Sequence, residues 1–71
     1  MKKTMIEGDY ILDILHERTS RHGITYRVAM LPDAPNMAFL FDNNNASGKW
    51  YLLRLGDPEI LTNTVNRICS R

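Results

Sequence analysis

Three short runs of alternating side chains, separated by turn-forming segments, place the tightest limits on the fold. Residues 24–31, 37–42 and 49–55 each alternate between side chains for the two faces of a sheet. Two prolines fall within residues 32–36, and three asparagines and a glycine fall within residues 43–48, so neither segment continues a strand. Such short connections predict a three-stranded antiparallel meander.

The segment that follows Gly56 has the composition of a helix start. Asp57 is a suitable N-cap, Pro58 fits the first helical position, and Glu59 complements the positive end of the helix dipole. An apolar stripe at helical spacing follows, made of Ile60, Leu61, Val65, Ile68 and Cys69. These features predict a helix that runs almost to Arg71.

Residues 9–22 also show apolar spacing that is typical of a helix. The apolar residues at i, i+1, i+4 and i+5 are Tyr10, Ile11, Ile14 and Leu15. Asp9 is a suitable N-cap, and an earlier start remains open because Thr4 and Glu7 have capping-box spacing. Gly23 follows two basic residues, as is common at a helix C-terminus. We therefore predict a first helix over this segment.

The predicted element order is α-β-β-β-α in one α+β domain that spans residues 1–71. Two short helices would both fit over one side of a three-stranded sheet. The expected architecture is therefore a three-stranded antiparallel meander with two helices packed on one face.

This element order, across the whole chain, resembles that of a double-stranded RNA-binding domain. The resemblance implies an RNA-contacting histidine in the loop between the first two strands and a lysine cluster at the start of the second helix. Here that loop, residues 32–36, has no histidine, and the helix opens with Asp57, Pro58 and Glu59. The resemblance concerns element order alone, so we assign no family membership.

Charge and cysteine content narrow the range of functions. The 71 residues include nine basic and eight acidic side chains, for a net charge of +1, so no overall field would attract nucleic acid or an anionic membrane. Cys69 is the only cysteine, and its place on the apolar stripe predicts a packed core thiol. Lys2 and Lys3 precede an apolar stretch too short for a signal peptide. We expect a cytoplasmic protein.

Side chains suited to catalysis or metal binding do not form a recognisable motif. Four potential metal ligands would share one face of the first predicted helix: Asp9, Asp13, His16 and Glu17. We favour a solvated polar face over a metal site, because such a face is the default for an amphipathic helix. His16 and His22 would point in different directions, and catalysis would need a distant partner such as Asp57. We predict no enzyme activity, no cofactor and no metal.

The sheet face that the helices leave uncovered gives the leading functional hypothesis. It is expected to carry an apolar patch flanked by arginines, and the residues predicted to bind a partner are Trp50, Leu52, Leu40, Arg27 and Arg54. The hypothesis is a small non-catalytic protein-interaction module, either a homodimer or an accessory or inhibitor protein of mobile-element type. Replacing Trp50 by alanine or Leu40 by glutamate should then abolish association and leave the fold intact. The alternative is that each face carries one helix and this face is a second core.

Nucleic-acid binding is the second hypothesis. It uses a weak basic patch made of Arg18, Arg21, Arg27 and Arg54. Acidic side chains such as Asp13 and Glu17 lie among these arginines in the sequence, which weakens the patch. Binding of this kind should weaken steeply with added salt.

Overall fold

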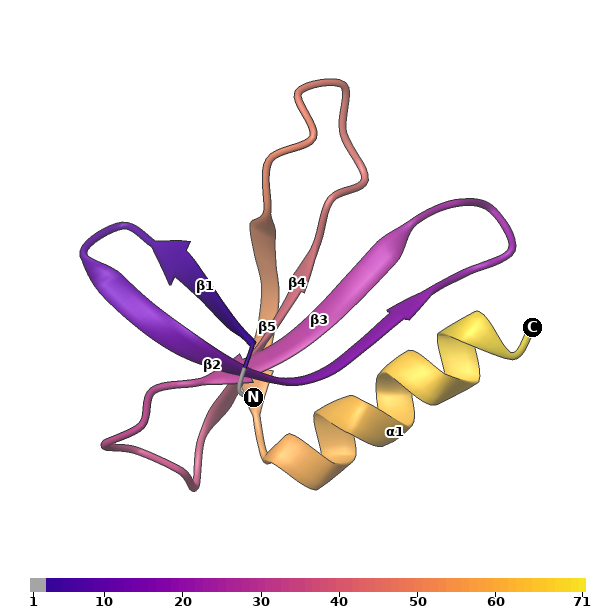
Figure 1. The fold of residues 1–71 in the computed structure, drawn as a ribbon. Coiled ribbons are helices and arrows are strands. Elements are labelled where there is room, and N and C mark those ends of the chain that lie inside the picture. The colour runs from indigo at the N-terminus through magenta and orange to yellow at the C-terminus, as the bar shows by residue number, and fades with distance from the viewer. Residues whose placement is uncertain (1–2) are drawn as a thin grey trace.

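A computed structural model describes residues 3–71, so Lys2 lies outside the described part of the chain. The elements are β1 (Thr4–Glu7), β2 (Tyr10–Thr19), β3 (Thr25–Met30), β4 (Ala38–Asp42), β5 (Tyr51–Gly56) and α1 (Pro58–Cys69). The five strands form one antiparallel sheet in which each strand pairs with its neighbour in sequence. Helix α1 packs on one side of this sheet, against β2, β3 and β4 (Figure 1).

The helix predicted over residues 9–22 is wrong, because this segment forms strand β2 and pairs with β1. Glu7 faces Tyr10 across the hairpin, so Gly8 and Asp9 form a two-residue loop. Gly8 has a φ of 59°, which suits the first position of a type II′ turn. The apparent capping box from Thr4 to Glu7 is therefore strand β1.

A β-bulge in β2 explains why its sequence resembles a helix. Ile14 pairs with Ala29 and His16 with Val28, which leaves Leu15 as the extra residue. The bulge breaks the strict alternation expected of a strand. Apolar residues on both faces then fall at positions that also satisfy a helical stripe, so the sequence periodicity was ambiguous.

The later elements agree closely with the sequence analysis. Strands β3, β4 and β5 fall within the three predicted runs, apart from one residue at the end of β5. Asp57 caps α1: its Oδ1 accepts hydrogen bonds from the backbone nitrogens of Glu59 at 2.9 Å and Ile60 at 3.3 Å. The complete fold is nevertheless β-β-β-β-β-α, so the α-β-β-β-α meander with two helices is wrong. The resemblance to the double-stranded RNA-binding domain no longer holds, because it depended on that order.

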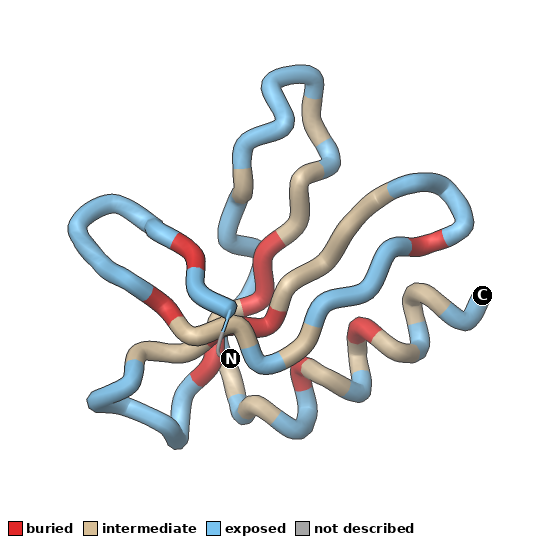
Figure 2. The backbone as a smooth tube through the Cα atoms, viewed as in Figure 1, coloured by how far each residue is buried: buried red, intermediate tan, exposed pale blue. Residues whose placement is uncertain are grey.

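Each face of the sheet carries its own apolar cluster. The helix-side cluster consists of Val28, Ala38, Leu40, Leu61 and Val65. Tyr26 and Cys69 pack against it, which confirms the predicted packed thiol. The opposite side of the sheet, here called the open face, has a buried cluster of Met5, Leu12, Ala29 and Phe41. Figure 2 shows buried segments in red on the β1–β2 hairpin, near the centre of the sheet, and on α1 where it faces the sheet.

The orientation of β4 differs from the expected one. Leu40 pairs with Val28 on the helix side, whereas Phe39 pairs with Ala29 on the open face. Leu40 was expected on the uncovered face, which is the reverse of its position in the structure. A shift of one residue in register exchanges the faces of a whole strand, and the loop before β4 does not reveal that register.

Candidate functional site

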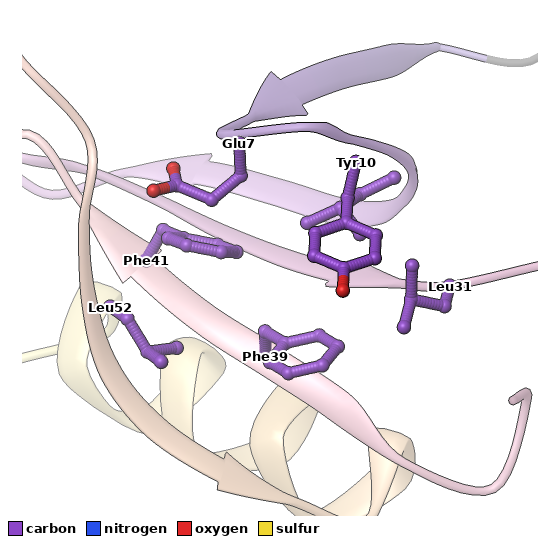
Figure 3. Close-up of a pocket in the computed structure, with 7 residues that line it drawn as sticks. Glu7, Tyr10, Leu31, Phe39, Phe41 and Leu52 are labelled. Atoms are coloured by element: carbon purple, nitrogen blue, oxygen red, sulfur yellow. The ribbon is translucent and has the colours of Figure 1, made fainter.

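The open face contains a pocket with a volume of about 310 Å³. We call it the open-face pocket. The residues that line it are Glu7, Tyr10, Leu12, Leu31, Phe39, Phe41 and Leu52. Figure 3 shows Glu7 and Tyr10 projecting from the β1–β2 hairpin, opposite Phe39 and Phe41 on β4. The pocket therefore lies between the first hairpin and the last two strands.

Backbone pairing places the residues of the pocket. Glu7 and Tyr10 are opposite each other next to the hairpin loop, so both side chains lie on the same face. Phe39 and Phe41 are two residues apart on β4, and their ring centroids lie 6.4 Å apart at an interplanar angle of 35°. Leu52 pairs with Phe41 and completes the wall on the β5 side. The result is an apolar, aromatic pocket with one carboxylate.

A stacked arginine lies on the same face of the sheet, over a tryptophan that packs against the open-face cluster. The guanidinium carbon of Arg27 is 3.9 Å from the centroid of the Trp50 ring, which is a cation–π contact. Arg27 also forms an ion pair with Glu17, directly across the β2–β3 ladder. Trp50 packs against the open-face cluster. The positive charge of Arg27 is thus held by an aromatic face and balanced by a carboxylate.

The structure separates the residues predicted to bind a partner. Trp50, Leu52 and Arg27 lie together on the open face. Leu40 is 3% exposed in the core beneath α1, so its expected place on the uncovered face is corrected. A bulge in β5 pairs Arg54 with Leu40, which directs this exposed arginine away from the open face.

The arginines of the nucleic-acid hypothesis do not gather on one surface. Arg18 lies on the helix side, where its Nη1 donates to Asn66 Oδ1 at 3.2 Å. Arg27 lies on the open face, and Arg21 is in the turn between β2 and β3. Arg54 is exposed on β5, where it faces Leu40 rather than the open face. The sheet thus divides the four cations between different surfaces.

The candidate metal ligands and bases are also dispersed. His16 Nε2 donates to Asn66 Oδ1 at 2.9 Å and so ties β2 to α1, whereas Glu17 contacts Arg27 on the other face. Asp57, the distant partner considered for catalysis, caps α1. Within residues 3–71, no three His, Cys, Asp or Glu side chains are grouped so that they could hold a metal ion.

Leu52 is the one lining residue that was predicted from the sequence. The other six were missed, and they are Glu7, Tyr10, Leu12, Leu31, Phe39 and Phe41. Tyr10 had been assigned to a helix, and Glu7 to a possible earlier start of that helix. One signal was present: Gly8 and Asp9 lie between two apolar segments, and glycine followed by aspartate is typical of a two-residue hairpin. That hairpin is what brings Glu7 and Tyr10 to the pocket.

Comparisons with protein-family models, curated proteins and solved structures found no match to this chain. In the described part of the chain, no helix has the length and apolar character needed to cross a membrane.

Tyr26 links the helix-side core to the pH dependence of stability. Burial, and secondarily the charge of Asp42, raise the pKa of the Tyr26 phenol above its ordinary value of 10.0. The folded protein holds this proton more tightly than the unfolded chain does. The resulting stability is fully present below about pH 10 and is lost as the pH rises through the folded-state pKa.

We expect the free energy of unfolding to fall above about pH 10, and to fall less in Tyr26→Phe, which lacks the phenol. Urea unfolding followed between about pH 8 and about pH 11 measures this difference. Tyr51→Phe, at an exposed position of β5, is the matched control. Equal alkaline losses in the parent protein and in Tyr26→Phe would contradict the assignment.

Proposed function

We propose that the protein is a small non-catalytic interaction module that binds another protein through the open face. It would act as an accessory or inhibitor by occupying the surface of its partner, either a different protein or a second copy of the chain. We also propose that it works in the cytoplasm, where a lone thiol such as Cys69 stays reduced.

The observation that supports this proposal is the composition of the open face. An apolar pocket lies on the same side of the sheet as the stacked pair of Arg27 and Trp50. Aromatic and arginine side chains dominate the energetic centres of protein interfaces. Leu52 is 50% exposed at the edge of this pocket. An apolar side chain in this position favours association, because binding would remove it from water.

The test compares two substitutions of exposed apolar residues. Leu52→Lys places a charge at the pocket, whereas Ile60→Lys changes a residue that is 58% exposed on α1. We expect the parent protein and Ile60→Lys to retain the same partner from a lysate of the source organism, and Leu52→Lys to lose it. Sedimentation velocity over a range of concentrations identifies the case in which that partner is a second copy.

Thermal unfolding of all three proteins shows whether Leu52→Lys remains folded. Equal retention of every partner by Leu52→Lys and the parent, with no change in sedimentation, would refute binding through this face. Loss of partners in Ile60→Lys alone would place the interface on the helix instead.

A further inference from the structure

The open-face pocket combines aromatic rings with a single acid. Glu7 is the only ionisable carboxylate among its lining residues, and the phenol of Tyr10 is the only other polar side chain. Three aromatic rings, those of Tyr10, Phe39 and Phe41, contribute to the lining. Aromatic faces attract cations, and an apolar wall accommodates the methylene chain of a long basic residue. The complementary group is therefore a cation on an apolar stem.

Among residues 3–71, no cation lines the pocket beside Glu7. The described lining residues include no lysine, arginine or histidine. Arg27, which lies on the same face, is already paired with Glu17 and stacked on Trp50. The charge of the pocket is thus available to a group from outside the chain.

The unpaired edge of β5 indicates that this group comes on an extended polypeptide. β5 is the last strand of the sheet, and within the described residues it pairs with β4 alone. Residues 51–55 are all exposed. Its sequence YLLRL has one charge and no proline, so the usual features that block an edge strand are scarce. An extended segment can add to such an edge through main-chain hydrogen bonds.

The edge and the pocket are adjacent. Leu52 belongs to β5 and also lines the pocket. A strand added outside β5 would lie about 4.8 Å from it, and every second side chain would face the open side. Because Leu52 and Glu7 line the same pocket, a long basic side chain at one of those positions would enter the pocket beside Leu52 and extend towards Glu7.

We propose that an extended segment of a partner protein adds to the edge of β5 and inserts a basic side chain into the open-face pocket. The ammonium or guanidinium group contacts Glu7 and the aromatic rings, and the apolar stem packs on Leu52. This inference rests on the proposed function and specifies which partner segment the site recognises.

The first experiment selects binders from a library of random nonapeptides displayed on phage. The targets are the parent protein, Glu7→Gln and Glu59→Gln, the last of which makes the same change in the first turn of α1. We expect a lysine or arginine at one fixed position of peptides selected by the parent and by Glu59→Gln, but not by Glu7→Gln. The inference would be overturned if the selected peptides had an uncharged residue at that fixed position, or if no peptide were selected.

The second experiment uses the best peptide made synthetically, with fluorescence anisotropy as the readout. Exchange of its basic anchor for norleucine should weaken binding to the parent by about 10-fold or more, the effect expected for a desolvated cation–π and ion contact. The two peptides should bind Glu7→Gln with similar affinity. An unchanged affinity of the norleucine peptide for the parent protein would refute the role of the cation.

Backbone methylation of the same peptide tests strand addition without altering the protein. N-methyl groups at alternate residues should abolish binding where the peptide N–H faces β5, and should be tolerated at the intervening residues. An effect without a period of two would refute strand addition. The selected peptides could lack a basic residue while Leu52→Lys still loses its partner. That result would refute this inference and leave the proposed function intact.

Discussion

We expect the replacement of Leu40 by glutamate to unfold the protein rather than to abolish association selectively. Leu40 is 3% exposed and packs beneath α1 with Val28, Leu61 and Val65. A carboxylate there would be buried without a partner, which costs several kcal/mol. Small domains have a total stability near the lower end of about 5–15 kcal/mol. The free-energy cost of burying this one charge is therefore comparable to the whole free energy of unfolding.

Circular dichroism during urea titration measures this effect directly. Leu40→Glu should show no cooperative transition. Leu53→Glu, at a position that is 50% exposed on the neighbouring strand, should keep the fold and change stability by no more than about 1 kcal/mol. A Leu40→Glu protein with native helix signal and a normal transition would show that this side chain is not part of the helix-side core.

Replacing Phe41 by alanine should lower the free energy of unfolding by about 3–5 kcal/mol, because it removes a large buried ring and leaves a cavity. Phe41 is 1% exposed and joins the residues of β1, β2 and β3 in the open-face cluster. The same ring lines the open-face pocket. The pocket is thus built partly on the core of the protein.

Phe39→Ala is the matched control, because Phe39 also lines the pocket but is only partly buried. Its stability loss should be clearly smaller than that of Phe41→Ala, as measured by urea unfolding at the same pH. Equal losses would contradict the different burial of the two rings. The difference also guides binding studies, since Phe39→Ala can probe the pocket while the domain stays folded.

The second half of the chain was predictable because its signals are local. Asp57, Pro58 and the apolar stripe after them define α1 without reference to any other segment. Strands β3, β4 and β5 were recognisable because prolines, asparagines and glycine mark the turns between them. Such features act over a few residues and do not depend on how the sheet is assembled.

The first hairpin and the faces of the strands depend on non-local packing. The bulge at Leu15 makes β2 resemble a helix, and only pairing with β1 and β3 reveals it as a strand. The face that Leu40 occupies is set by register with β3, which its own sequence does not encode. Trp50, Leu52 and Arg27 do lie on one face, as expected. The contribution of Glu7 and Tyr10 to that face was missed, because it depends on the pairing of β1 with β2.

The helix-side core has a consequence for the order in which the chain folds. Each strand pairs with its neighbour in sequence, so the sheet can grow by successive hairpins as the ribosome releases them. Val28 and Leu40 become buried only when Leu61 and Val65 of α1, which are synthesised later, pack against them. Until α1 emerges, the nascent sheet presents this apolar surface to chaperones and to other unfinished chains. The final twelve-residue helix thus completes the fold and also ends the period in which the chain is most prone to misassembly.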